Sequence, residues 1–128
     1  MTSWSDRGWL LLRVLLGCPM VLLHGWSKAQ LLFAAGPVEF ADPLGLGATP
    51  TLVMAVASEF VAPLLVLLGV ATRWAATLTA ATMGVAFFVI HGGALTGDDS
   101  GELAFVYLVG FAAIALGGGG SLVLRRPR

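Results

Sequence analysis

Charged residues are scarce in this sequence, and their scarcity excludes an ordinary soluble domain. Only 11% of the 128 residues are Asp, Glu, Lys or Arg, whereas 58% are hydrophobic and the mean hydropathy is +0.92. A soluble domain of this size needs a charged surface, which so few charged side chains cannot supply. The formal net charge is zero, so no basic patch for nucleic acid is expected. The apolar surface therefore has to face lipid.

Cysteine and recognisable catalytic motifs are also lacking. Cys18 is the single cysteine, so an intramolecular disulfide, a CxxC redox pair and a cysteine metal site are excluded. No Walker loop, GxSxG elbow or dinucleotide fingerprint occurs, and the glycine run at 117–120 lacks the lysine that a phosphate-binding loop requires. The sequence therefore predicts no intrinsic cofactor.

Four apolar runs predict an all-α integral membrane protein. They cover about residues 8–26, 52–70, 74–90 and 101–117. A bilayer core of roughly 30 Å needs about 17–25 helical residues, and backbone polar groups cannot stay unpaired in lipid, so each run is expected to span the membrane as a helix. Residues 1–128 then form one four-helix bundle domain. A signal peptide cleaved near Ala34-Ala35-Gly36 is the competing interpretation of the first run, but polar residues before that site disfavour it.

The distribution of basic residues predicts the orientation of the bundle. With four spans, both termini and the turn at Thr72-Arg73 lie on one side. That side carries Arg7, Arg73, Arg125, Arg126 and Arg128. The opposite side carries Lys28 together with five carboxylates. Because Lys and Arg are enriched in cytoplasmic loops, we expect both termini to be cytoplasmic, in a multi-pass protein of the bacterial inner membrane.

The outer loop between the first two spans, residues 29–50, is too apolar for a plain solvated loop. Proline suits the first position of a helix, so Gly36-Pro37 predicts the start of a short interfacial helix. Gly45 and Gly47 would end that helix. We expect the segment to lie over the outer mouth of the bundle.

Titratable residues within apolar spans are costly and are therefore candidates for function. The predicted topology brings one from each span to the outer half of the membrane. They are His24, Glu59, His91 and Glu102. Lys28 lies one turn beyond His24, and Arg13 shares its helix face. Pro63 removes the backbone N–H that would bond the carbonyl of Glu59, which favours a local bend there.

A quinone-linked site is the first interpretation of these residues. The catalytic residues would be Glu59, which relays protons, with His24 and His91, which bind the carbonyl ends of the quinone. The ligand-binding residues would be Arg13, Lys28 and Glu102. Because the chain contains no electron carrier, electrons would have to pass to a redox partner protein or an external acceptor.

Two other interpretations stay open. Two imidazoles and two carboxylates from four helices could hold a metal, but they include no i, i+3 or i, i+4 pair, so no metal site is predicted. A non-enzymatic assembly or scaffold protein would use the same polar groups only to satisfy one another. A stripe of small residues at Ala76, Ala80 and Gly84 suits helix packing within the bundle or between copies, which leaves a homo-oligomer open.

The order of these residues resembles the DoxX family of small bacterial and archaeal membrane proteins. The resemblance rests on Arg13-x3-Gly17, His24-Gly25-Trp26-Ser27-Lys28, Glu59, Leu68-Gly69-x2-Thr72-Arg73, His91 and Gly101-Glu102. It implies a four-helix fold in the cell membrane, with the functional residues already named for the quinone-linked site. Relatives include the membrane subunit of thiosulfate–quinone oxidoreductases, so the resemblance also implies an association with redox chemistry. The ending, Gly117 to Leu122, lacks the family's usual proline.

Overall fold

A computed structural model describes residues 2–124, and every regular element in that range is helical. The first long helix consists of α1 (Trp4–Pro19), the π-helical turn η1 (Met20–Gly25) and α2 (Trp26–Phe33). The second consists of α3 (Ala48–Val56), the π-helical turn η2 (Ala57–Val61) and α4 (Ala62–Leu68). The third consists of α5 (Thr72–Val85) and the π-helical turn η3 (Ala86–Ile90), and the fourth is α6 (Glu102–Gly117).

The predicted all-α membrane bundle is confirmed. Within residues 2–124, three continuous helices are long and apolar enough to cross a membrane, and α6 is a shorter apolar helix of 16 residues. Large apolar side chains such as Leu23, Phe88 and Leu116 are exposed along the outside of the bundle. Since a membrane protein places such side chains against lipid, the outer surface fits contact with the bilayer.

The first helix is longer than its apolar run, which predicted only residues 8–26. It starts at Trp4 because Ser3 and Asp6 form a capping box that bonds the free N–H groups of its first turn. It continues to Phe33 because Ala29 is buried against Leu52 and Val56 of the second helix. Packing therefore extends the helix beyond the part that hydropathy alone predicts.

The interfacial helix expected at Gly36-Pro37 is absent, because residues 34–47 have no regular structure. The side chain of Asp42 binds this segment to itself by accepting hydrogen bonds from the backbone N–H groups of Leu46 and Gly47 and from the Thr51 hydroxyl, at 2.8–3.0 Å. Such bonds compete with helical backbone bonds. Val38 and Phe40 pack onto the second apolar cluster, so the segment is nevertheless anchored to the bundle.

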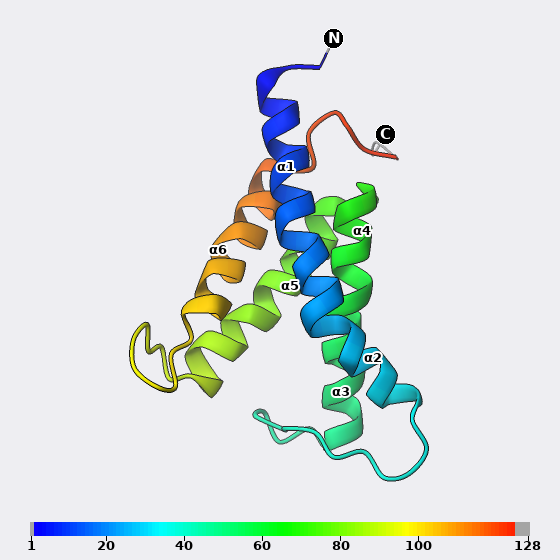
Figure 1. Ribbon diagram of the computed structural model, residues 1–128, viewed down its shortest axis with the longest axis vertical. Coiled ribbons are helices and arrows are strands. Elements are labelled where there is room, and N and C mark those ends of the chain that lie inside the picture. The colour runs from blue at the N-terminus through cyan, green and yellow to red at the C-terminus, as the bar shows by residue number, and fades with distance from the viewer. Residues whose placement is uncertain (1, 125–128) are drawn as a thin grey trace.

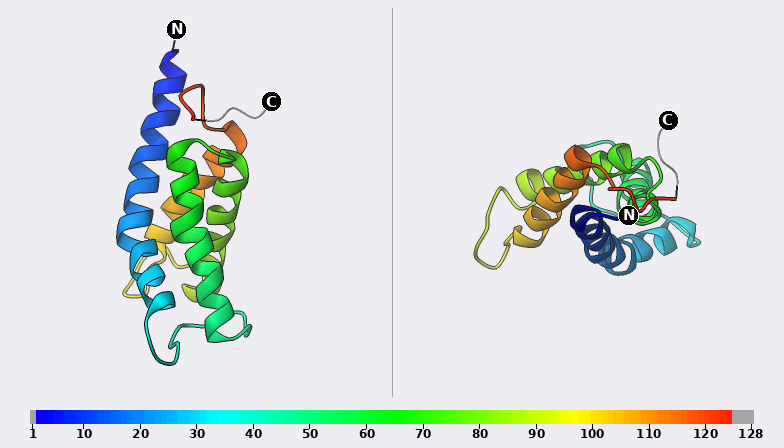
Figure 2. Two further views of the ribbon diagram at one scale, coloured as in Figure 1. Left: turned by 90° about the vertical axis from the view of Figure 1, so that its right-hand side faces the viewer. Right: turned by 90° about the horizontal axis from the view of Figure 1, so that it is seen from above.

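The helices pack closely at one end of the molecule and separate at the other. The start of α1, the segment at 118–124 and the turn at residues 69–71 lie at the closed end, and the loops at 34–47 and 91–101 lie at the other (Figures 1 and 2). α5 and α6 run side by side, and α1 packs against both α4 and α6. Ala76 and Ala80 are buried in the main core with Phe111, so the small-residue stripe serves a contact within the chain.

Arg13 closes the end that carries the termini. Arg13 is 1% exposed, and its guanidinium group donates four hydrogen bonds to backbone carbonyl groups. The acceptors are Val66 at 2.7 Å, Leu67 at 2.7 Å, Gly119 at 3.0 Å and Leu122 at 2.7 Å. The last carbonyl groups of a helix lack donors within the helix. Arg13 donates to such carbonyl groups at the end of α4, and it also bonds the segment after α6.

Candidate functional site

A cavity of about 450 Å³ lies at the end of the bundle where the two long loops are. This volume is typical of sites for small organic molecules. Its lining comes from all four long helices and from both loops. The polar lining includes the side chains of His24, Lys28, Glu59, His91 and Tyr107. Apolar side chains supply most of the remaining wall, as in other ligand cavities.

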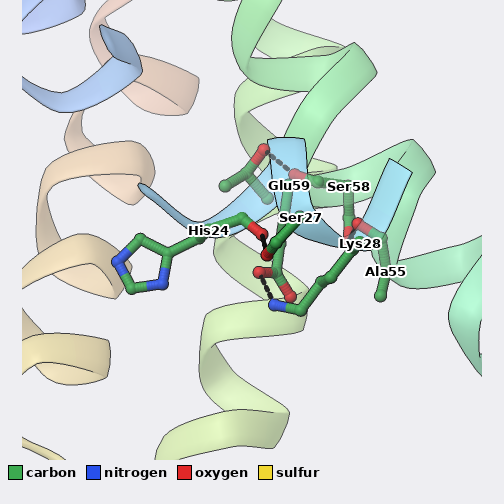
Figure 3. Close-up of polar contacts among 7 residues, drawn as sticks. His24, Ser27, Lys28, Ala55, Ser58 and Glu59 are labelled. Carbon is green, nitrogen blue, oxygen red and sulfur yellow. Dashed lines mark hydrogen bonds and ion pairs between the residues drawn. The ribbon is translucent and has the colours of Figure 1, made fainter. Parts of the chain in front are cut away.

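An ion pair between Lys28 and Glu59 lies in the wall of this cavity. The two side chains reach toward each other from the first and second long helices (Figure 3). The side chain of Glu59 is 7% exposed and that of Lys28 is 24% exposed, so the carboxylate is the more deeply buried partner. A buried carboxylate is very costly without a positive charge beside it, so Lys28 offsets the cost of burying Glu59.

His24 and Tyr107 form a second pair in the cavity wall. The His24 ring points away from the ion pair (Figure 3), and its edge meets the ring of Tyr107 at a centroid distance of 5.6 Å and an angle of 81°. Tyr107 is only 6% exposed. Among residues 2–124, no side chain or backbone group forms a hydrogen bond with the His24 ring or the Tyr107 hydroxyl, so both are available to a ligand.

His91 lines the cavity from the end of the third helix, in a defined tautomer. Its Nδ1 atom lies 3.0 Å from the backbone carbonyl oxygen of Asp99. Because a carbonyl oxygen only accepts hydrogen bonds, Nδ1 must carry the proton. The Nε2 atom of neutral His91 is therefore an acceptor, which can take a proton from a hydroxyl group.

Three π-helical turns surround the cavity. η1 carries His24, η2 carries Glu59, and η3 ends directly before His91. Such turns are rare and often occur at functional sites, because the extra residue widens the helix and redirects a side chain. In η2 the N–H of Ala62 bonds the carbonyl of Ala57, and Pro63 follows immediately without an N–H of its own. The irregularity beside Glu59 and Pro63 therefore takes the form of a π-helical turn, and the local bend expected from Pro63 stays a prediction.

Comparison with known proteins identifies the family. The sequence model of the DoxX family matches residues 8–92, which covers the first three long helices and most of the cavity wall. The chain belongs to the DoxX family. It is also 30% identical over 113 residues to a protein of Haemophilus influenzae described as uncharacterized, a match that covers 82% of this chain and 79% of that protein. No solved structure gives a significant match.

The DoxX family match and the apolar helices together show a multi-pass membrane protein. Four of the six predicted site residues lie around the cavity. They are His24, Lys28, Glu59 and His91. Arg13 does not, because its guanidinium is bound to four carbonyl groups at the closed end instead of reaching a ligand. Glu102 is exposed outside the lining, since α6 begins there and turns its Leu103 and Tyr107 toward the cavity.

Tyr107 is the cavity residue that sequence reasoning missed. It is the only tyrosine of the chain and lies within an apolar run, beyond residues 8–92, which match the DoxX family model. That isolation was the available signal, because a buried tyrosine usually needs a polar environment for its hydroxyl. Within residues 2–124, no group of three or more His, Cys, Asp or Glu side chains is arranged to hold a metal ion.

Gly25 allows the first two helices to touch at Glu59. A methyl group at Gly25 would overlap the backbone of Glu59 and Phe60. We therefore expect Gly25→Ala to destabilise the protein by about 1–3 kcal/mol in thermal unfolding in detergent, because overpacking forces the helices apart. Gly8→Ala is the matched control on the same helix, since nothing lies within 4 Å of its added carbon. A Gly25→Ala protein as stable as the control would show that the contact is loose.

Asp42 makes the loop over the cavity sensitive to low pH. The backbone N–H of Gly47 is the main cause that holds the pKa of Asp42 below the ordinary aspartate value of 3.8, and Leu46 and Thr51 add to it. A lowered pKa in the folded state means that the contribution of Asp42 is complete above pH 3.8 and is lost as the pH falls through the folded value. Hydrogen exchange at Leu46 and Gly47, corrected for intrinsic rates, should therefore rise only below that pH. Asp42→Ala should show the faster exchange already at neutral pH, whereas Glu39→Ala should not.

Proposed function

We propose that this DoxX-family protein binds the headgroup of a quinone in the bacterial inner membrane and acts as the quinone-binding component of a redox system. The observation that carries the proposal is the joint position of His24, Glu59, His91 and Tyr107 around one cavity. A quinone carbonyl needs a hydrogen-bond donor, and both the His24 ring and the Tyr107 hydroxyl are available as donors.

The proton chemistry of a quinone fits the remaining side chains. A quinol that is oxidised loses two protons and two electrons. The Nε2 atom of His91 is an acceptor for one hydroxyl proton, and the Glu59 carboxylate beside Lys28 is a second proton acceptor. The electrons would pass to a redox partner protein, since binding, orientation and proton transfer are what the cavity residues can supply.

Titration of the purified protein in nanodiscs with a short-chain ubiquinone tests this function. We expect saturable binding that His24→Phe and Tyr107→Phe each weaken by about tenfold, because each variant removes one hydrogen-bond donor to a quinone carbonyl, about 1.4 kcal/mol. Glu39→Gln is the control, because Glu39 is an exposed loop carboxylate outside the lining.

Two results would contradict the proposal. Equal binding by the wild type and both cavity variants would place the quinone elsewhere. Absence of saturable binding, together with co-purification of a stable protein partner, would favour the assembly or scaffold role in place of quinone chemistry.

A further inference from the structure

The cavity wall is polar at its buried end and apolar at its exposed edge, whereas a site that opens to water has polar side chains at its edge. Its most buried lining includes the polar side chains of Glu59 and Tyr107, at 6% exposure each. Its exposed lining is apolar. The large side chains of this exposed rim are Leu44, Leu46, Met54, Ile90 and Leu103, each between 51% and 56% exposed. No charged or amide side chain is exposed in the rim that residues 2–124 form.

From this arrangement we infer that the cavity opens sideways into the outer hydrocarbon layer of the membrane and binds an amphiphile. The opening lies between the loop at 34–47 and the helix ends at Ile90 and Leu103. The tail of the amphiphile leaves the cavity through this rim. Exposing the apolar rim to water would cost free energy, because apolar surface is unfavourable in water. Contact with the hydrocarbon of lipid carries no such cost. The buried polar end then receives a headgroup, and the rim receives the first part of an isoprenoid or alkyl tail.

The rim comes from four separate parts of the chain, which supports a role beyond ordinary lipid contact. Leu44 and Leu46 come from the loop, Met54 from α3, and Ile90 and Leu103 from the third and fourth helices. The loop is held in place there by the three hydrogen bonds of Asp42. The direction of the opening does not depend on the proposed function, but the identification of the amphiphile as a tailed quinone does.

Site-directed spin labelling measures the direction of the opening without any ligand. Because Cys18 is the only cysteine, Cys18→Ser gives a background into which single cysteines can be placed. We expect a nitroxide at Leu103→Cys or Ile90→Cys to collide at least about threefold more with oxygen than with a polar nickel chelate, since hydrocarbon admits the first and excludes the second. Val106→Cys, on the same helix, 51% exposed and outside the lining, is the lipid-facing control, and Asp98→Cys in the outer loop is the water-facing control.

Addition of quinones then tests the tail. Decylubiquinone should lower the oxygen collisions of the Leu103→Cys label by about twofold or more and leave the Val106→Cys label unchanged, whereas a ubiquinone without a tail should change neither. Rim labels that behave like Asp98→Cys would overturn the sideways opening. Spin–spin broadening between copies at Leu103→Cys would also overturn it, because a second copy would then cover the rim. If neither quinone binds but the rim labels match Val106→Cys, the quinone function fails and the sideways opening stands.

Discussion

Replacing Arg13 with methionine is expected to lower the free energy of unfolding by about 3 kcal/mol or more, because four backbone carbonyl groups lose a charged donor at once. Methionine keeps most of the side-chain volume, so the loss reports on the hydrogen bonds and not on a large cavity. Chemical unfolding in detergent measures the change. Hydrogen exchange should rise most in residues 118–124, because the carbonyl groups of Gly119 and Leu122 lose their bonds to Arg13. The bond from the Ser121 N–H to the Asp6 carboxylate of α1 would remain.

The variant Arg13→Lys separates the effect of the guanidinium geometry from the effect of the charge. Arg13→Lys keeps the charge but replaces a planar group with a single ammonium, which cannot reach carbonyls of both α4 and the C-terminal segment, so we expect an intermediate loss. Arg7→Met is the control, because Arg7 is exposed and contacts the Trp4 ring. A stable Arg13→Met protein with unchanged exchange would show that the closed end holds together without the guanidinium.

Replacing Lys28 with methionine is expected to cost about 3–5 kcal/mol at neutral pH, because Glu59 would remain buried without a positive partner. Glu59→Gln should cost less, since Lys28 is 24% exposed and can turn its ammonium group outward. The double variant Lys28→Met, Glu59→Gln should recover most of the loss. The three variants form a double-mutant cycle that measures the coupling of the pair in chemical unfolding.

The double variant provides the control on this explanation. If the two side chains stabilise one another, the double variant should be clearly more stable than the sum of the two single losses predicts. If the single losses simply add in the double variant, the two side chains do not depend on one another and the ion pair is not what holds the cavity wall.

The membrane architecture could be predicted from the sequence because the physics of the bilayer acts locally. Any run such as 52–70 must bond its own backbone groups in lipid, and helix is the state that does so. The gathering of His24, Glu59 and His91 at one end followed from the same alternation of direction between spans. Lys28 could be placed near His24 because four residues make about one helical turn. These predictions needed no knowledge of distant contacts.

The positions of Arg13 and of the outer loop could not be predicted, for different reasons. Arg13 depends on partners far away in the sequence, since it bonds Leu122, which is 109 positions away. Helical periodicity places a residue on a face but does not say which carbonyl groups meet it. In the loop, Gly36-Pro37 favours a helix locally, but Asp42 bonds the backbone of Leu46 and Gly47 instead.

The π-helical turns change which residues share a face of the same helix. A π-helical turn holds one residue more than an α-helical turn, so the residues that follow it are rotated by about 100° relative to an uninterrupted α-helix. On the first helix this rotation occurs between Arg13 and Lys28, so the two ends of that helix contact different neighbouring segments. A relative that lost one residue from Met20–Gly25 would keep the same hydropathy profile and nearly the same helix length, yet it would direct a different side chain at Glu59.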